Sequence, residues 1–163
     1  MKYYLGCAWN LLLLQLGLGS VRELKQQRVK VFLGSLSRER VNALSIDFAK
    51  KDIPLILRPN ALERLKEHQQ KGHEVYIVSA SFAFCLEVWA KQNGVHLVTN
   101  NVDWSAKKLV GPDCNGEEKV NRLRKIVDLE KVEEIFAYGD TPGDHPMLEI
   151  ADNPYYCFFH HTK

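Results

Sequence analysis

Two carboxylates lie on a tight turn near the C-terminal end of the chain. The stretch IFAYGDTPGDHPML (135–148) runs from apolar residues into Gly139-Asp140, and a second acid, Asp144, follows four residues later. Carboxylate oxygens, completed by waters and a substrate phosphate, are the usual ligands of Mg²⁺ in proteins. Glycines allow a sharp turn at such a position, but Asp, Pro and Gly also build ordinary turns. Taken alone, the pair leaves a metal site and a plain polar turn equally open.

A serine and a lysine earlier in the chain could bind an anion. Ser79 follows the apolar run EVYIV (74–78) and precedes Ala80 and Ser81. A hydroxyl there can bind an anion together with free backbone N–H groups of the next helix. The alternative is a serine that caps the next helix. Lys119 lies about one turn into a helix expected after Asn115, where a cation is mildly unfavourable. That placement suits a lysine aimed at phosphate, although a solvated surface lysine is the simpler alternative.

The elements that must position these residues alternate from residue 58 onward. We expect helices at 59–72, 82–93, 115–127 and 146–151, strands at 74–81, 95–100, 135–138 and 155–159, and a hairpin within 101–111. Strands that alternate with helices predict a parallel sheet with right-handed crossovers. Because ligands bind beyond the carboxyl ends of such strands, Ser79 and Asp140 are expected at one edge of the sheet.

The first third of the chain has a helical pattern. Apolar residues at helical spacing predict one amphipathic helix: Val21, Leu24, Val29 and Phe32. Ser37 begins a second helix, which Pro54 ends. The apolar run within residues 1–19 resembles a secretory signal, but polar residues interrupt it and no clear cleavage site follows. We therefore favour an apolar helix packed within the protein, and the run is too short for a membrane span.

Composition is that of an ordinary globular domain. The chain has 163 residues with 45% apolar and 26% charged content and a net charge of +2, which fits one domain without a nucleic-acid partner. The cysteines are far apart and include no Cys-x-x-Cys pair: Cys7, Cys85, Cys114 and Cys157. This argues against a zinc site or a disulfide framework and favours the cytoplasm. His160 and His161 would suit a metal, but an exposed C-terminal end is the expected explanation.

Three segments, taken in order, resemble a known family. VSAS (78–81), GEEKVNRL (116–123) and YGDTPGDHPML (138–148) are similar to the second, third and fourth motifs of haloacid dehalogenase-like phosphatases. The branch that contains phosphoserine phosphatase is the most similar. The resemblance covers residues 58–159 and implies an α/β fold with a three-layer, parallel-sheet, Rossmann-like core. It also implies two parts, a helical cap segment over residues 1–55 and the core over 56–163.

The resemblance assigns a role to each candidate residue. Ser79 and the backbone at Ala80 would bind the phosphoryl group of a small phosphorylated metabolite. Lys119 would pair with that phosphate and with the nucleophile, and would be catalytic together with Asp140. Asp140 would coordinate Mg²⁺, and Asp144 would coordinate or support it.

The chain departs from that family in two places. Gly143 stands where the phosphoserine phosphatases have an asparagine. The family's nucleophile is an aspartate of an Asp-x-Asp-x-Thr motif on a strand before the cap. No such motif occurs here, because no two of the aspartates are two positions apart: Asp47, Asp52, Asp103, Asp113, Asp128, Asp140, Asp144 and Asp152. In the family this central strand lies between the strands that end here at Ser79 and Asp140. Without it, two strand edges must close together, find another strand or stay exposed.

Three hypotheses follow. In the first, the chain is an N-terminally truncated, inactive form of a Mg²⁺-dependent phosphatase that acts through an aspartyl-phosphate. In the second, it is a non-catalytic relic that binds phosphate or a partner strand. In the third, it is an unrelated doubly wound binding domain, such as a response-regulator-like one. We favour the first because all four motif residues are present: Ser79, Lys119, Asp140 and Asp144. Exposed sheet edges would also allow a homodimer.

Overall fold

The structure, a computed structural model, describes residues 20–160; the run within 1–19 and His161 lie outside the described residues. Its helices are α2 Val21–Leu33, α3 Arg38–Lys51, α4 Ile53–Ile56, α5 Pro59–Gln70, α6 Ala83–Gln92, α7 Glu117–Leu123 and α8 His145–Glu149, with 3₁₀ turns at Leu129–Lys131, Pro142–Asp144 and Phe158–His160. Its strands are β1 Tyr76–Phe82, β2 His96–Asp103, β3 Lys108–Val110, β4 Phe136–Gly139 and β5 Asn153–Tyr156. Over this part of the chain, no helix is both long and apolar enough to cross a membrane.

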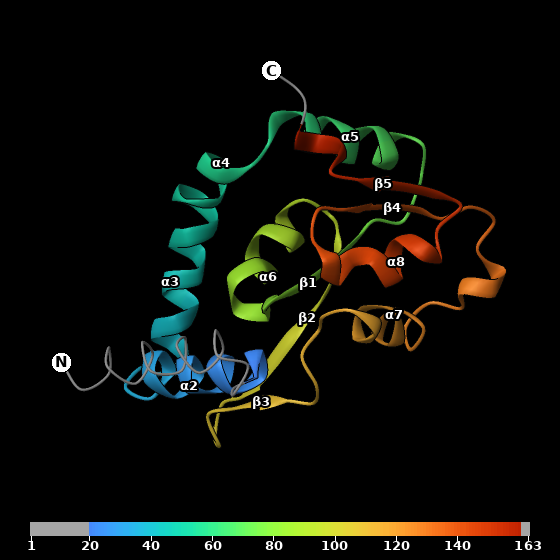
Figure 1. Cartoon of the computed structure of the whole chain (residues 1–163). Helices are drawn as coiled ribbons and strands as arrows, with labels where there is room; N and C mark the ends of the chain where they lie inside the picture. The colour runs from blue at the N-terminus through green and yellow to red at the C-terminus, as the bar shows by residue number, and fades with distance from the viewer. Residues whose placement is uncertain (1–19, 161–163) are drawn as a thin grey trace.

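The strands form two separate groups (Figure 1). β1 pairs in parallel with β2, and β2 continues into an antiparallel hairpin with β3. β4 pairs in parallel with β5 and with no other described strand. The predicted α/β class and the hairpin are therefore confirmed. The predicted parallel sheet is divided, however, because β1 and β4 do not pair with each other.

Local signals explain how the N-terminal helices begin. Ser20 accepts a hydrogen bond from the backbone N–H of Glu23, whose carboxylate accepts from the N–H of Ser20, a capping box at the start of α2. Ser37 caps α3 in the same way by accepting from the N–H of Arg40. The apolar faces of α2 and α3 then pack with the hairpin in one core cluster: Val29, Leu33, Val41 and Leu109.

A second core cluster supports the elements that carry the candidate site. Val98 of β2, the fully buried Cys114 and Leu123 of α7 pack together, with Met147 of α8 against them. Asn115 was expected to cap this helix, but that expectation is wrong. The residue before α7 is Gly116, which has a φ of 56° and no side-chain cap. Glycine reaches that left-handed conformation at little cost, so the chain turns there and α7 begins one residue later than an Asn115 cap would allow.

Candidate active site

A pocket of about 620 Å³ opens between the carboxyl ends of β1 and β4. It is lined by all five residues proposed for the site: Ser79, Ala80, Lys119, Asp140 and Asp144. Ser79 and Ala80 lie in β1, the two acids follow β4, and Lys119 comes from α7. Residues up to sixty-five positions apart in the sequence thus meet because parallel strands end on the same side of the fold.

The segment after Ser79 leaves the regular strand. Ser79 is opposite Thr99 of β2, but the next paired residues are Phe82 and Asn100, so the two residues between them, starting with Ala80, form a bulge. Ser79 Oγ accepts a hydrogen bond of 3.1 Å from the N–H of Ser81 within this bulge. α6 begins only after Phe82 and has no side-chain cap. The alternative that Ser79 caps this helix is therefore wrong, and the bulge places small residues on the pocket wall.

Lys119 is buried rather than solvated. Its ammonium group pairs with Asp144 Oδ1, and each of the two side chains is only 8% exposed. The surface-lysine alternative is therefore wrong. The α7 helix that carries Lys119 points it into the pocket beside the β4 turn. A buried ammonium held in this way is a fixed positive charge beside the space that a ligand would enter.

Asp144 is held by hydrogen bonds at both of its oxygens. While Oδ1 accepts from Lys119, Oδ2 accepts from the N–H of Asp140 at 3.2 Å and from the N–H and Oγ1 of Thr141 at 3.0 and 2.7 Å. Burial raises the pKa of the Asp144 carboxyl, but the hydrogen bonds from Lys119 and Thr141 outweigh it and leave this pKa below its ordinary value. A Cβ at Gly139 would lie 2.5 Å from Asp144 Cβ, so glycine is needed there for space.

Asp140 is the more accessible of the two acids. Its side chain is 49% exposed, and Oδ2 lies 3.1 Å from His160 Nε2 and 3.9 Å from an Arg58 guanidinium nitrogen. Exposed ion pairs of this kind contribute little to stability, about 0–1 kcal/mol, so neither partner locks the carboxylate. Among the described residues, no group of three or more His, Cys, Asp or Glu side chains forms a metal site. Asp140 can offer an oxygen to Mg²⁺, but a complete ligand set needs further groups.

Asn115 occupies the space beside Gly143. A Cβ built on Gly143 would overlap Asn115 Oδ1, and the two loops are joined by a hydrogen bond of 3.0 Å from the N–H of Gly116 to the carbonyl of Gly143. Asn115 also lines the pocket. Asn115 thus fills the space that a side chain at position 143 would need, a feature that the sequence prediction missed.

The edge of β1 that faces away from β2 carries main-chain groups that pair with no strand within residues 20–160. The carbonyl of Val75 accepts from the N–H of His96 at 2.8 Å, so the main-chain groups of Val75 point toward β2. In a strand, the N–H and C=O groups of successive residues point to opposite sides. Those of Tyr76 and Val78 therefore point away from β2, and Val78 itself lines the pocket.

The edge of β4 has the same character. The N–H of Asn153 donates to the carbonyl of Ile135 at 3.0 Å, which directs Ile135 and alternate residues after it toward β5. Phe136 and Tyr138 consequently direct their main-chain groups to the other side, and Tyr138 lines the pocket. No described strand pairs with either edge. The pocket is therefore bounded by two open strand edges.

Taken together, the fold and the site define an α/β domain with a serine, a lysine and two acids at the ends of parallel strands. The sequence profile of the haloacid dehalogenase-like hydrolases matches residues 1–149. The chain belongs to that family.

Two known proteins are similar to this chain in sequence. Protein CicA from Caulobacter vibrioides is 32% identical over 143 residues, which cover 84% of this chain and 64% of that protein. The inhibition of morphological differentiation protein from Streptomyces azureus is 24% identical over 147 residues, which cover 80% of this chain and 51% of that protein. The chain thus spans between half and two thirds of the length of these relatives.

Solved structures share the fold. A protein of unknown function from Bordetella pertussis Tohama I superposes with a TM-score of 0.78 at 20% identity, covering 86% of this chain and 67% of that one. A phosphoserine phosphohydrolase-like protein from Francisella tularensis subsp. tularensis SCHU S4 superposes with a TM-score of 0.58 at 17% identity, covering 95% and 72%. At these identities the likeness concerns the fold alone.

Proposed function

We propose that this chain carries the phosphate-binding and Mg²⁺-binding part of a phosphatase that hydrolyses a small phosphorylated metabolite. The observation that carries the proposal is the meeting of Ser79, Lys119 and Asp140 in one pocket at the carboxyl ends of β1 and β4. Membership of the haloacid dehalogenase-like hydrolases supports this reading. The phosphoserine phosphohydrolase-like structural neighbour agrees with it.

Each residue has a role that its geometry suits. The Lys119 ammonium and the bulge at Ser79 and Ala80 bind the phosphoryl oxygens, where preorganised positive charge and N–H groups stabilise a phosphoryl-transfer transition state. Asp140 holds Mg²⁺, which when bound neutralises charge on the phosphoryl group. Asp144 acts as a support, because its two oxygens are engaged by Lys119 and the β4 turn.

The nucleophile comes from outside the described residues. In the proposed reaction, an aspartate carboxylate attacks phosphorus and the alcohol leaves with a proton; water then hydrolyses the aspartyl-phosphate and releases inorganic phosphate. The pocket's own acids do not suit this step, because Asp144 is fully engaged and Asp140 is assigned to the metal. We therefore expect no significant phosphatase activity from the 163-residue chain alone.

The test uses a longer protein that adds an N-terminal strand ending in Asp-x-Asp-x-Thr. We expect Mg²⁺-dependent hydrolysis of p-nitrophenyl phosphate by this protein, and its loss in Asp140→Asn. The matched control is Asp47→Asn, because Asp47 is exposed on α3 and forms an ion pair with the exposed Lys51, away from the pocket. Full activity of Asp140→Asn would refute the metal role. Turnover by the 163-residue chain that disappears in Asp140→Asn would refute the external nucleophile.

A second candidate function, binding of a partner strand, rests on the open edges of β1 and β4. No strand within residues 20–160 pairs with either edge, so their main-chain groups suit the addition of one extended segment between them. The N–H of Val78, which points away from β2 into the space between the two edges, offers a selective probe. Val78→Pro removes this N–H without removing a hydrogen bond to β2. A fluorescent ten-residue apolar peptide that binds the wild-type chain but not Val78→Pro would support this function. Equal binding to both would argue against it, and self-association in the absence of peptide would identify a second copy as the occupant.

A further inference from the structure

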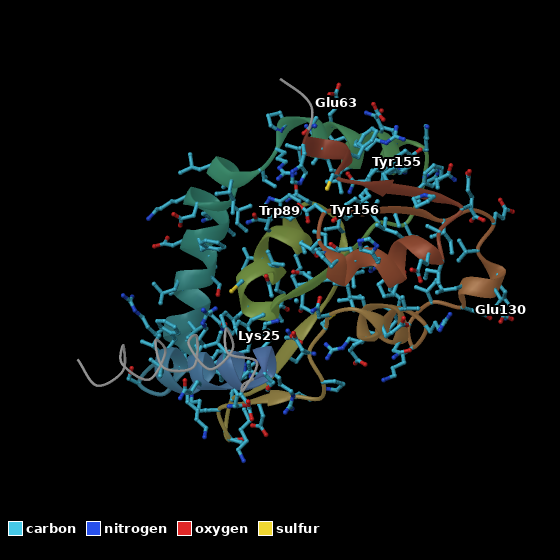
Figure 2. The ribbon with its side chains drawn as sticks, in the orientation of Figure 1. Lys25, Glu63, Trp89, Glu130, Tyr155 and Tyr156 are labelled. Atoms are coloured by element: carbon cyan, nitrogen blue, oxygen red, sulfur yellow. The ribbon has the colours of Figure 1, made fainter. Side chains whose placement is uncertain are left out.

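Lys25 of α2, labelled in Figure 2, also lines the pocket of the candidate site. Its Nζ donates to both carboxylate oxygens of Asp113, at 2.6 and 2.8 Å, and to the carbonyl oxygen of Ala80 at 3.0 Å. The side chains of Lys25 and Asp113 are only 17% and 14% exposed. An ammonium group has three hydrogens to donate, so these contacts account for all of them.

A buried asparagine joins the same contacts from another direction. Asn100, the last residue of β2 that pairs with β1, is 1% exposed. Its Nδ2 donates to the carbonyl of Ala80 at 2.8 Å and to Asp113 Oδ1 at 2.6 Å, while its Oδ1 accepts from the N–H of Cys114 at 2.8 Å. The carbonyl of Ala80 therefore accepts two hydrogen bonds, one from β2 and one from α2.

That carbonyl belongs to the bulge that interrupts the pairing of β1. Between Ser79 and Phe82 the regular ladder to β2 is missing, so side-chain donors take the place of strand hydrogen bonds at Ala80. A bulge leaves its extra residues without ladder partners. The orientation of the peptide group between Ala80 and Ser81, and with it the Ser81 N–H, therefore depends on what holds the Ala80 carbonyl.

The helix that carries Lys25 is itself fixed to the β2–β3 hairpin and to the segment after β3, which carries Asp113. Gln26 Nε2 donates to the carbonyl of Lys107 at 3.0 Å, and Gln26 Oε1 accepts from the N–H of Leu109 at 2.9 Å. Arg22 donates to the carbonyl of Gly111 at 2.9 Å. A displacement of α2 would thus move Lys25 and disturb its contact with Ala80.

We propose that Lys25 and Asp113 are positioning residues that fix the bulge at Ala80 and Ser81, so that the placement of α2 sets the phosphate affinity of the pocket. The coupling to the bulge is independent of function, whereas its effect on a phosphate ligand rests on the proposed function. Lys25 acts through the Ala80 carbonyl, because Asp113 and Ala80 already occupy its donors.

Charge alone and positioning make opposite predictions for one variant. Asp113→Asn removes a negative charge next to the pocket and leaves the positive charge of Lys25. If charge alone mattered, inorganic phosphate would bind this variant more tightly. If Lys25 must be held in place to fix the bulge, inorganic phosphate binds it more weakly. Lys25→Met weakens binding under both ideas, so Asp113→Asn is the decisive change.

The experiment uses the ¹⁵N-labelled 163-residue chain and has two measurements. The first is hydrogen exchange of the Ser81 amide without ligand, which we expect to be about tenfold faster in Lys25→Met and Asp113→Asn, since a hydrogen bond to a charged group is typically worth about that factor or more. The second is a titration with inorganic phosphate, in which we expect both variants to bind about tenfold more weakly. Lys30→Met is the matched control, because Lys30 is exposed on the same helix, and should match the wild type in both.

Two results would overturn the proposal: Ser81 exchange that stays at the wild-type rate in both variants, or tighter phosphate binding by Asp113→Asn. Urea midpoints measured in parallel separate local loosening of the bulge from global destabilisation of the fold. If Lys25→Met does not fold, Lys25→Gln, which keeps a hydrogen-bond donor, replaces it. If the wild-type chain binds no phosphate, the proposed function loses its phosphate site, while the exchange of Ser81 still decides whether Lys25 and Asp113 hold the bulge.

Discussion

Asp144→Asn should be strongly destabilising, because it leaves a buried lysine without its partner. Lys119 and Asp144 are each 8% exposed, and removal of one partner of a buried ion pair typically costs about 3–5 kcal/mol. An asparagine at this position also has one oxygen where the carboxylate has two, so its amide NH₂ must face either Lys119 or the N–H groups of the β4 turn. We expect the free energy of unfolding to fall by about 3–5 kcal/mol.

A double-mutant cycle measures the interaction itself. Lys119→Met should cost less, about 1–3 kcal/mol, because Asp144 keeps its hydrogen bonds from Asp140 and Thr141 and loses only one partner. The double variant should be more stable than the sum of the two losses predicts, with a coupling of about 0.5–3 kcal/mol. The assay is urea unfolding at pH 7 followed by circular dichroism, with an unchanged slope as the sign that only stability changed.

Acid provides an independent check on the same pair. The pKa of Asp144 lies below its ordinary value of 3.8, so its carboxylate adds stability above that pH and loses the contribution as the pH falls through the folded-state pKa. The difference between wild type and Asp144→Asn should therefore narrow below about pH 4. A loss of less than about 1 kcal/mol at pH 7, comparable to that of an exposed pair, would refute the reasoning. So would a difference that stays constant in acid.

Three further predictions concern the rest of the fold. Burial lowers the pKa of His68 below 6.5, so the unfolded chain binds the proton more readily than the folded chain. The free energy of unfolding should therefore fall as the pH drops below about 6.5. Urea midpoints across this range should vary less in His68→Asn than in the wild type. Gly143→Ala should cost about 1–3 kcal/mol through overlap with Asn115, and Asn115→Ala should recover most of that loss in the same assay; no recovery would contradict the overlap. Leu33 is 3% exposed, so Leu33→Ala should lower the free energy of unfolding by about 2–5 kcal/mol. Its neighbour Phe32 is 62% exposed, so Phe32→Ala should change it by less than about 0.5 kcal/mol. Equal losses of stability would contradict the assignment of the core face of α2.

The sequence was informative wherever a local pattern fixes a local structure. Apolar runs located β1, β2 and β4, and Ser37 located the start of α3, because strand alternation and helix capping are read over a few residues. The expected meeting of Ser79 and Asp140 followed from one topological rule, that parallel strands end at the same edge. Asn115 misled for the same reason: its spacing to Glu118 fits a capping box, but Gly116 turns the chain first.

Other features depend on tertiary placement, which no local pattern encodes. Lys25 and Arg58 line the pocket, yet each looks like an ordinary charge at a helix in the sequence. The bulge after Ser79 appears only when the register with β2 is known. Asn100, which reads as a polar strand end, is 1% exposed because its amide satisfies groups from two other segments.

The stability of the β4–β5 pair needs its own explanation, because two isolated strands are marginal in water. Tyr138 stacks on Tyr155 with ring centroids 4.8 Å apart, and its hydroxyl accepts a hydrogen bond of 2.7 Å from Arg64 and lies 3.0 Å from His68 Nε2. α5 thus supports one side of β4 through polar contacts, and α8 packs against both strands.

This support bears on the open edges. If β4 needed a strand between itself and β1 for stability, the β4 turn would be disordered without that strand. Asp140 and Asp144 would then not be held in position. Because α5, α8 and Tyr155 hold β4 without a contribution from β1, Asp144 stays paired with Lys119 while the space between the edges of β1 and β4 is unfilled. An added strand therefore meets a site that is already arranged. Under the proposed function, its binding should supply a nucleophile rather than fold the pocket. Amide exchange of the β4 turn that slows strongly when a strand is added would contradict this order of events.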